Sequence, residues 1–588
     1  MRRLCLLLLS LATFVASAAD FGGEKVTRMV PPRRSTQLRD GFGMNQFLPR
    51  EPRLPWSRRW WTRLFDSGVK WVRIGQYENS SDLTSWDWVE QRPGHYAILP
   101  ELDEAVRSLV ENGVTVEVQL QYSNPLFQGD PAKRPRRVLL PPPGIGQDDE
   151  PVNPIFLPPQ TDEQIGAFLR HVRFMVNHFR GRVKHWELWN EPNIGYWRPH
   201  TDTKEELVAK ARGYGKVLSR FADVVHQTDP EAKVISGGLA GPDLLFARAA
   251  LGECPGKIDI IAYHTYPGFG SNHMPEEADT RDGAAFFRQQ LVQLPGIRND
   301  VAFWNNEWNV APGWKGSNDS VQARYVPRFF VYHHAQGVRG AMWTFVPSTD
   351  GNEDDLFGVL HGDTGDANAF QPRPAYRAFQ VTSALFGQTV VDPMAEFRFR
   401  GVPEQYNHGA LQARAFRDVV TGRRIYAFWL AVLADPTDSF APVEAELAIQ
   451  DQALRDPVLI DVRTGEVMPL RWAAKGSLAV PLKDSVMAVA DASYLDWLEV
   501  PEAPGELRAT LSSGSVTLDW KSYSGPSRTV IQKSLDFGRW RAAGEVAPGE
   551  SHFEESVRAK GRVTYRVMSV GNTGASPWSN PAWVDSAR

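Results

Sequence analysis

Two glutamates stand at the ends of two apolar runs of the sequence, and an asparagine precedes each of them. Glu191 closes the run HWELWNE (185–191), and Glu307 closes the run VAFWNNE (301–307). A carboxylate is rarely enclosed by apolar residues unless it has a partner or a chemical task. The two glutamates lie 116 residues apart, so the elements between them decide whether they meet.

Two facing carboxyl groups at a few ångströms are what the hydrolysis of an acetal requires. One group must be protonated, to donate to the departing oxygen, and the other must be ionised, to attack or stabilise the carbon. Like charges in close proximity push the two pKa values apart and so assign the roles. This logic alone does not say which glutamate is the acid.

Eight short apolar or β-branched runs, separated by helix-like segments, extend from about residue 40 to residue 347. The predicted strands are 41–45, 71–76, 114–122, 185–191, 233–238, 258–267, 301–309 and 339–347. The clearest helix begins at Thr161, which forms a capping box with Gln164 and precedes apolar residues at helical spacing. Eight alternations of strand and helix predict an α/β fold, a (β/α)8 TIM barrel.

The spacing of the two glutamates fits this barrel. At roughly 38 residues per strand–helix unit, three units separate equivalent positions by roughly 114 residues. We therefore expect Glu191 and Glu307 at equal heights, at the carboxyl ends of strands four and seven, facing one another across the barrel mouth. Glu187 lies deeper on strand four and is expected to be a hydrogen-bonded interior group.

These motifs resemble the retaining glycoside hydrolases of clan A, among which families 39 and 5 are the most similar. WNEPN (189–193) and the second glutamate at the end of strand seven carry the resemblance, which covers about residues 40–390. It implies that Glu191 is the general acid/base and Glu307 the nucleophile of a glycosyl-enzyme mechanism. The resemblance is specific for the mechanism and weak for the sugar.

The same resemblance implies supporting roles for five further residues. Asn190 would hold the sugar 2-hydroxyl, and Arg73 at the end of strand two would lie beneath the nucleophile and keep it ionised. His264 and Tyr266 match a His-x-Tyr pair on strand six, with Tyr266 bonded to the nucleophile. Trp343 on strand eight matches the tryptophan that forms the floor of the sugar subsite. Structural interpretations stay open: an ion pair for Arg73, a core position for His264 and barrel packing for Trp343.

Tryptophan is abundant in the barrel segment, where 13 of the 20 tryptophans precede residue 350. The flat apolar face and polar edge of this side chain suit sugar rings, although core packing is its ordinary use. Five tryptophans are expected at the same rim as the glutamates, some of them as subsite walls: Trp189, Trp197, Trp304, Trp308 and Trp314.

No metal or other cofactor is expected. His333 and His334 are adjacent in a predicted helix, where neighbouring side chains diverge, and no His-x-His motif occurs among the 13 histidines. Once Cys5 has left with the predicted signal peptide, Cys254 is the remaining cysteine, which excludes a thiolate zinc site. A metal-dependent barrel hydrolase is therefore disfavoured.

The chain divides into four predicted segments. Residues 1–19 carry two arginines, a short apolar core and small residues, the pattern of a signal peptide, which predicts a secreted or periplasmic protein. Residues 20–389 form the catalytic barrel and 390–499 a β-sandwich domain. Residues 501–588 resemble a fibronectin type III module, with Trp520 in its core and Tyr565 at the tyrosine-corner position.

The predicted partner is a carbohydrate substrate. A formal net charge of −4 without a basic excess argues against nucleic acid, and no later apolar run approaches the ~18 residues of a membrane span. The sequence thus predicts an exported retaining β-glycosidase acting on a poly- or oligosaccharide. A catalytically inactive carbohydrate-binding or adhesion protein and a transglycosylase using the same residues remain alternatives. The sugar, the linkage, endo or exo action, the task of the Pro-rich insertion at 131–160 and the oligomeric state stay open.

Overall fold

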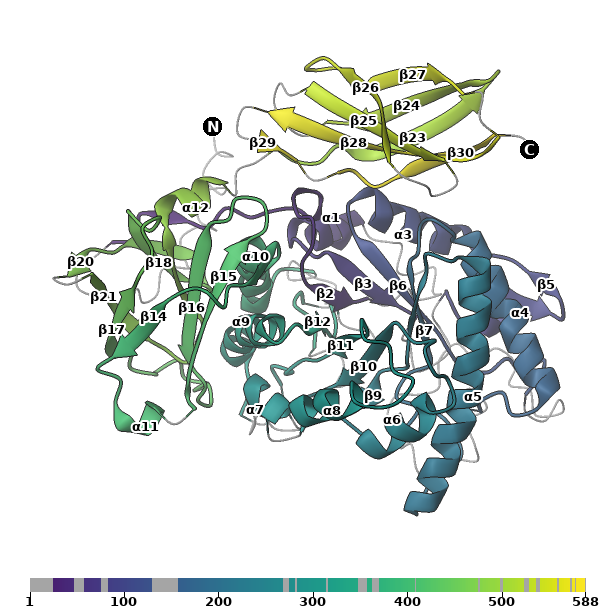
Figure 1. The fold of residues 1–588 in the computed structure, drawn as a ribbon, viewed down its shortest axis with the longest axis horizontal. Helices are drawn as coiled ribbons and strands as arrows, with labels where there is room; N and C mark the ends of the chain where they lie inside the picture. Colours follow the sequence, from purple (N-terminus) through teal and green to yellow (C-terminus); the bar gives the residue numbers. More distant parts are fainter. Residues whose placement is uncertain are drawn as a thin grey trace, which may run out of the picture.

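A computed structural model arranges the chain in three parts: a barrel, a two-sheet domain beside it and a smaller sandwich (Figure 1). It describes residues 25–46, 58–75, 83–128, 157–267, 274–280, 283–313, 316–346, 357–361, 370–407, 409–473, 476–497, 501–522, 528–535, 540–557, 560–571, 574–576 and 578–586. The predicted signal peptide and most of the 131–160 insertion lie outside the described residues, so both stay predictions.

Eight parallel strands among the described residues close the predicted barrel, because β10 pairs with β11 and completes the ring. In order around the ring they are β2 (Gly43–Asn45), β3 (Trp71–Ile74), β6 (Thr115–Leu120), β7 (His185–Leu188), β8 (Lys233–Ile235), β10 (Ile260–His264), β11 (Ala302–Glu307) and β12 (Arg339–Met342). A short strand β9 (Leu239–Ala240) also pairs with β10. Each of the eight lies within a predicted strand, so the (β/α)8 fold is confirmed.

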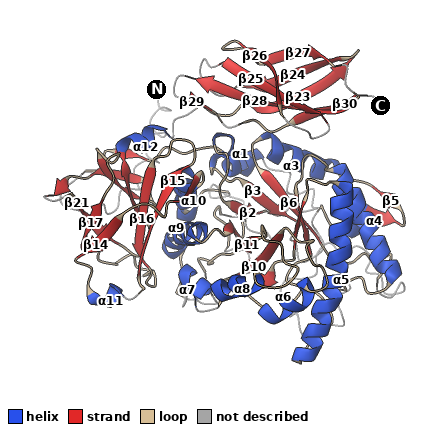
Figure 2. Ribbon diagram, in the orientation of Figure 1, coloured by secondary structure: helices blue, strands red, loops and turns tan. Residues whose placement is uncertain are grey.

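Helices cover the outside of this ring (Figure 2). They are α1 (Arg58–Asp66), α2 (Trp86–Val89), α3 (Pro100–Glu111), α4 (Asp162–His178), α5 (Lys204–Thr228), α6 (Leu244–Leu251), α7 (Pro275–Thr280), α8 (Ala284–Leu291), α9 (Asp319–Ala335) and α10 (Pro374–Phe386). A 3-10 turn (Ser35–Gln37) precedes the barrel, and a hairpin of β4 (Glu90–Arg92) and β5 (His95–Tyr96) follows β3. Helix α4 starts at the predicted capping box, in which the Thr161 hydroxyl accepts from the Gln164 backbone N–H at 3.2 Å.

The fourth barrel strand ends earlier than the sequence predicts. Extended pairing stops at Leu188 instead of Glu191, and Asn190 keeps one isolated bridge to Gly238. Trp189 has a φ of 69° and Glu191 a φ of 39°, a backbone region that residues with a Cβ atom rarely adopt. The chain therefore turns over the barrel mouth, and Glu191 projects from this turn.

Alternate strand residues fill the barrel interior in layers. The lower layer is apolar and contains Trp71, Ile235, Ile260, Ala262, Trp304 and Ala341, with the rings of Trp71 and Trp304 at 4.8 Å between centroids. The next layer is charged, because Arg73, Glu117 and Glu187 point inward and are fully buried. The predicted rim position of Trp304 is wrong, since this residue lies three positions before the end of β11 and packs into the barrel floor.

The second part is a sandwich of two antiparallel sheets around one apolar core. The larger sheet contains β1 (Arg28–Met29), β19 (Glu466–Pro469), β18 (Pro457–Asp461), β22 (Met487–Asp491), β16 (Arg424–Leu430), β15 (Leu411–Asp418) and β13 (Thr389–Val391). The smaller contains β14 (Phe397–Arg400), β17 (Val443–Ile449), β21 (Ser477–Leu482) and β20 (Trp472–Ala473), and helices α11 (Glu404–Asn407) and α12 (Ala492–Trp497) lie in the same part.

One boundary of the predicted catalytic domain, which began at residue 20, differs from the structure. Arg28 and Met29 pair with Val467 and Glu466 at the edge of the larger sandwich sheet. The chain therefore contributes an edge strand to the second part before it enters the barrel. Backbone pairing at a sheet edge requires no particular side chains. Two residues so far from the sandwich in the sequence therefore gave no indication that they would pair with its edge.

The third part is a smaller sandwich with a core of its own. One sheet contains β23 (Gly505–Ser512), β24 (Ser515–Lys521) and β27 (His552–Ser556), and the other β26 (Arg541–Val546), β25 (Arg528–Leu535), β28 (Gly561–Gly571), β29 (Gly574–Ala575) and β30 (Ala582–Ser586). Trp520 and Tyr565 lie in the core. The Tyr565 hydroxyl donates to the Glu555 side chain at 2.7 Å, whereas a tyrosine corner bonds the backbone. The fibronectin type III assignment stays a prediction.

The third part packs against the end of the barrel where the strands begin (Figure 1). Arg562 donates to the Arg180 carbonyl at 3.4 Å, and the guanidinium of Arg182 lies 5.8 Å from the ring centroid of Trp583. Because Arg180 and Arg182 lie between α4 and the start of β7, this contact is at the far end from the predicted site. Within the described ranges, no helix combines the length and apolarity that a membrane crossing needs.

Candidate active site

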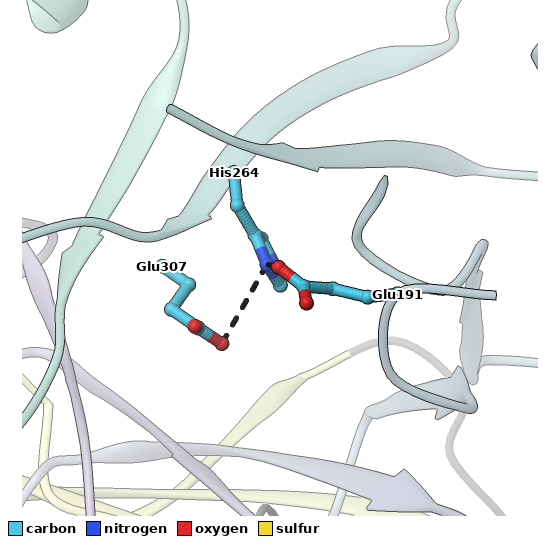
Figure 3. Close-up of side chains that lie close together, drawn as sticks. All are labelled: Glu191, His264 and Glu307. Carbon is cyan, nitrogen blue, oxygen red and sulfur yellow. Dashed lines mark hydrogen bonds and ion pairs between the residues drawn. The ribbon is translucent and has the colours of Figure 1, made fainter. Parts of the chain in front are cut away.

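Glu191, Glu307 and His264 converge at the carboxyl ends of the barrel strands (Figure 3). The Nδ1 atom of His264 lies 2.8 Å from Oε1 of Glu191 and 3.6 Å from Oε2 of Glu307. One oxygen of each glutamate and one ring nitrogen of His264 all lie within 4.8 Å of one another. The two glutamates thus meet over the barrel mouth, as their spacing in the sequence predicts.

Glu307 is held through both of its carboxylate oxygens. Nη1 of Arg73 donates to Oε2 at 2.9 Å, and the Tyr266 hydroxyl donates to Oε1 at 2.8 Å. Arg73 approaches from below, from β3, and Tyr266 comes from the segment that follows β10. These contacts fix the orientation of the carboxylate, and they are the contacts that the resemblance implies for a nucleophile.

Asn190 and Trp343 border the same region. The amide oxygen of Asn190 accepts from Nη2 of Arg73 at 3.3 Å and from Gln119 at 3.5 Å. Trp343 directly follows β12 and belongs to an apolar cluster against which Tyr266 packs. The structure therefore brings all seven predicted site residues together, while their roles toward a substrate stay predictions.

The expectation that rim tryptophans form open subsite walls is wrong for those that the structure describes. Trp189 and Trp308 are fully buried, and Trp197 is 5% exposed. Trp308 stacks on Phe329 with 4.2 Å between ring centroids, and Trp189 packs edge-on against Trp197. These three rings belong to the main hydrophobic core instead. Trp314 lies outside the described residues.

Comparison with solved structures shows that other proteins share this architecture. A family 39 glycoside hydrolase from Bacteroides cellulosilyticus WH2 aligns with a TM-score of 0.56 at 20% identity, over 79% of this chain and 83% of that chain. The chain has the fold of a family 39 glycoside hydrolase. The bacterial orthologue of human α-L-iduronidase aligns with a TM-score of 0.47 at 13% identity, over 96% of this chain and 99% of that chain.

One curated protein is similar to part of this chain. A β-xylosidase from Caldicellulosiruptor saccharolyticus is 25% identical over 253 residues, which cover 40% of this chain and 48% of that protein. The chain thus matches about half the length of this relative. No family model matches the sequence. The resemblance to clan A glycoside hydrolases is confirmed at the level of the fold.

In this glycoside hydrolase fold, the two glutamates have different electrostatic surroundings. Burial raises the pKa of Glu191 to about 7, against the opposing positive charge of Arg73. Burial and the negative charge of Glu191 raise the pKa of Glu307, but the positive charge of Arg73 and the hydrogen bond from Tyr266 oppose that rise. Burial lowers the pKa of His264 to about 4, so its imidazole is neutral near pH 7. Glu191 is therefore the better proton donor and Glu307 the better-stabilised anion.

A buried polar network lies beneath the site, and most of its members are not among the predicted site residues. Nδ2 of Asn306 donates to Oε1 of Glu117 at 2.9 Å and to Oε1 of Glu187 at 3.3 Å. Gln119 donates to Oε2 of Glu187 at 3.1 Å. The sequence could have predicted this network, because polar residues at alternate positions of the apolar strand 114–122 indicate polar side chains inside the ring. Glu187 is a hydrogen-bonded interior group, as expected.

Gly238 permits the close approach of this network to the site. Its backbone N–H donates to Oε1 of Glu187 at 2.8 Å. A Cβ atom at this position would lie 2.0 Å from Nε2 of His264. A residue with a side chain would displace the imidazole, so the position requires glycine.

Glu191, Glu307 and His264 are also residue types that bind divalent cations. Both oxygens of Glu307, however, already accept from Arg73 and Tyr266, and the guanidinium charge lies beside them. Over the described part of the chain, no second group of three such side chains comes together. The contacts of this group favour proton transfer over metal chemistry.

Proposed function

We propose that this protein is a retaining β-glycosidase that hydrolyses O-glycosidic bonds of an oligo- or polysaccharide. The observation that carries the proposal is the separation of one oxygen of Glu191 from one oxygen of Glu307, which is at most 4.8 Å. Retaining enzymes hold their carboxyl groups ~5–5.5 Å apart, whereas inverting enzymes leave ~6.5–9.5 Å for a water molecule. The short separation supports direct attack by a carboxylate on the anomeric carbon.

In the first step, Glu191 donates its proton to the departing glycosidic oxygen while Glu307 attacks the anomeric carbon. A glycosyl ester forms on Glu307 and the aglycone leaves as an alcohol. The raised pKa of Glu191, about 7, supports its role as the acid. The two donors to Glu307, Arg73 and Tyr266, support an ionised nucleophile in a fixed orientation.

In the second step, Glu191 acts as a base. Ester formation removes the negative charge of Glu307, and this loss lowers the pKa of Glu191 because the two like charges no longer repel. Ionised Glu191 takes a proton from water, whose oxygen attacks the anomeric carbon and releases the sugar from Glu307. The product keeps the configuration of the substrate, and Glu191 again holds its proton.

The proposed substrate class follows from the curated relative, which is named a β-xylosidase. Aryl β-xylosides are therefore the first compounds to test, followed by other β-glycosides. Action outside the cytoplasm is part of the same proposal, because Met1–Ala19 has the pattern of an export signal.

Mechanism-based labelling tests the proposal. A 2-deoxy-2-fluoro-β-xyloside with an activated leaving group should esterify Glu307, and peptide mass spectrometry should locate the label there. Glu307→Gln should take up no label, while Glu404→Gln, a matched change at an exposed residue of α11, should label like the wild type. If a panel of fluorosugars with other ring configurations also leaves the wild type unlabelled, the inactive carbohydrate-binding protein becomes the better description.

A further inference from the structure

Three buried glutamates surround one arginine at the base of the site. Arg73 binds Glu187 through two nitrogens at 2.6 and 2.9 Å, binds Glu307 through a third at 2.9 Å, and lies 3.5 Å from Glu117. The imidazole of His264, which also faces this group, is neutral near pH 7. Three ionised glutamates would leave a net charge of −2 in an enclosed interior, which is strongly unfavourable.

Hydrogen-bond donors are divided unequally between Glu117 and Glu187. Glu187 accepts from Arg73 through both oxygens and also from the backbone N–H of Gly238 at 2.8 Å. Glu117 accepts from Asn306 at 2.9 Å through Oε1, and its Oε2 is enclosed with no donor in reach among the described residues. Because an enclosed carboxylate oxygen without a donor is costly, Glu117 is the group better suited to hold a proton.

An acceptor for that proton lies next to Glu117. Glu117 and Glu187 are neighbours, because one nitrogen of Asn306 donates to both of them, at 2.9 and 3.3 Å, and Nε of Arg73 lies 3.5 Å from Glu117 and 2.6 Å from Glu187. Two carboxyl groups bond one another only when one of them is protonated. Burial and the charge of Glu187 both raise the pKa of Glu117 well above its ordinary value.

We propose that Glu117 keeps a proton, shares it with Glu187, and acts as a positioning residue for Arg73 and Glu307. With Glu117 neutral, Arg73 meets one ionised carboxylate from below, Glu187, and one from above, Glu307. When Glu307 becomes esterified, the remaining Arg73–Glu187 pair is neutral. The catalytic part of this inference rests on the proposed glycosidase function, whereas the buried proton is a property of the folded chain.

Infrared difference spectroscopy on the full chain detects the proton directly, because a protonated carboxyl group absorbs at a higher frequency than a carboxylate. At about pH 9, some two units above the pKa of about 7 for Glu191, we expect one carboxyl band to persist in the wild type. The band should be absent from Glu117→Gln and also from Glu187→Gln, where Glu117 ionises to replace the lost partner of Arg73. Glu404→Gln should keep it. Absence of the band from the wild type, or its survival in either interior variant, would overturn the proposal.

Kinetics tests the positioning role. Glu117→Gln keeps a neutral hydrogen-bonding side chain, so kcat/KM should stay within about threefold of the wild type, with an unchanged acid limb. Glu117→Leu loses the bonds to Asn306 and Glu187 and should lower kcat by about 100-fold, because Arg73 and Glu307 are displaced. Were Glu117 ionised, Glu117→Gln would remove a negative charge beside Arg73 and move the acid limb to lower pH, which would contradict the inference. An inactive wild type would count against the proposed function alone, since the infrared experiment decides the proton without activity.

Discussion

The imidazole of His264 forms a hydrogen bond with Glu191, the residue for which we propose a change of protonation state during the reaction. Nδ1 lies 2.8 Å from Oε1 of Glu191, and burial keeps the ring neutral by lowering its pKa to about 4. A neutral imidazole accepts a hydrogen bond at one ring nitrogen and donates a hydrogen bond from the other, and its tautomer decides which nitrogen does which. Glu191 can therefore lose and regain its proton without losing this partner.

The rate of hydrolysis should depend on pH in a bell-shaped manner. For an unactivated β-glycoside, kcat/KM should fall as the pH rises through about 7, where Glu191 loses the proton that it donates. On the acid side, kcat/KM should fall as Glu307 takes up a proton. This fall should lie above pH 4.5, the ordinary pKa of a glutamate, because burial raises the pKa of Glu307. The pH profile of kcat/KM reports these ionisations in the free enzyme.

A variant separates the two limbs. Glu191→Ala, assayed with an aryl glycoside whose leaving group needs no protonation, should lose the alkaline limb and keep the acid one. A wild-type rate that stays constant up to about pH 9 would contradict the assignment of Glu191 as the acid.

Replacement of Glu191 by glutamine should stabilise the protein at alkaline pH. Folding raises the pKa of Glu191 from 4.5 to about 7, so the folded state binds this proton more tightly than the unfolded state. This contribution to the free energy of unfolding is complete below pH 4.5 and is lost as the pH rises through 7. At pH 8 the free energy of unfolding is therefore lower by about 3 kcal/mol. Glu191→Gln should therefore raise Tm at pH 8 and leave it unchanged at pH 4. Equal shifts at both pH values would point to packing instead of charge.

Glu276 ties the segment after β10 to the second part of the molecule. Its carboxylate accepts from Arg328 at 2.9 and 2.7 Å and from Nε1 of Trp429 at 2.6 Å, in surroundings where all three residues are buried. Glu276→Gln removes the charge that neutralises Arg328 and should destabilise the protein by about 3–5 kcal/mol, because a buried cation loses its partner. Urea unfolding measures this loss, with Glu404→Gln as the exposed control. An unchanged midpoint would show that Arg328 is neutralised by another group.

Removal of divalent cations should leave hydrolysis unaffected. Glu307 is already engaged by Arg73 and Tyr266 at 2.9 and 2.8 Å, and the proposed steps move only protons and a glycosyl group. We expect the same kcat/KM before and after dialysis against a chelator. Activity that is lost on dialysis and restored by a divalent cation would contradict this expectation.

The sequence by itself determined the barrel and the positions of its two glutamates. Strand and helix periods are local patterns, and each observed barrel strand lies inside an apolar run that predicts it. Because the barrel repeats one unit, the spacing of Glu191 and Glu307 was enough to predict that they meet. The tryptophans gave no such guide, since Trp308 stacks on Phe329 and Trp189 packs edge-on against Trp197, and only the tertiary packing selects these neighbours.

Only the tertiary structure decided how the site is supported. Asn306 and Glu117 are 189 positions apart in the chain, yet they share a hydrogen bond inside the ring. Trp189 takes a positive φ that aims Glu191 over the barrel mouth, and no local pattern predicts it. Arg28 pairs with Val467 at a sheet edge through backbone groups alone. Periodicity reports which side of an element is buried, whereas the identity of the buried neighbours depends on how distant elements pack.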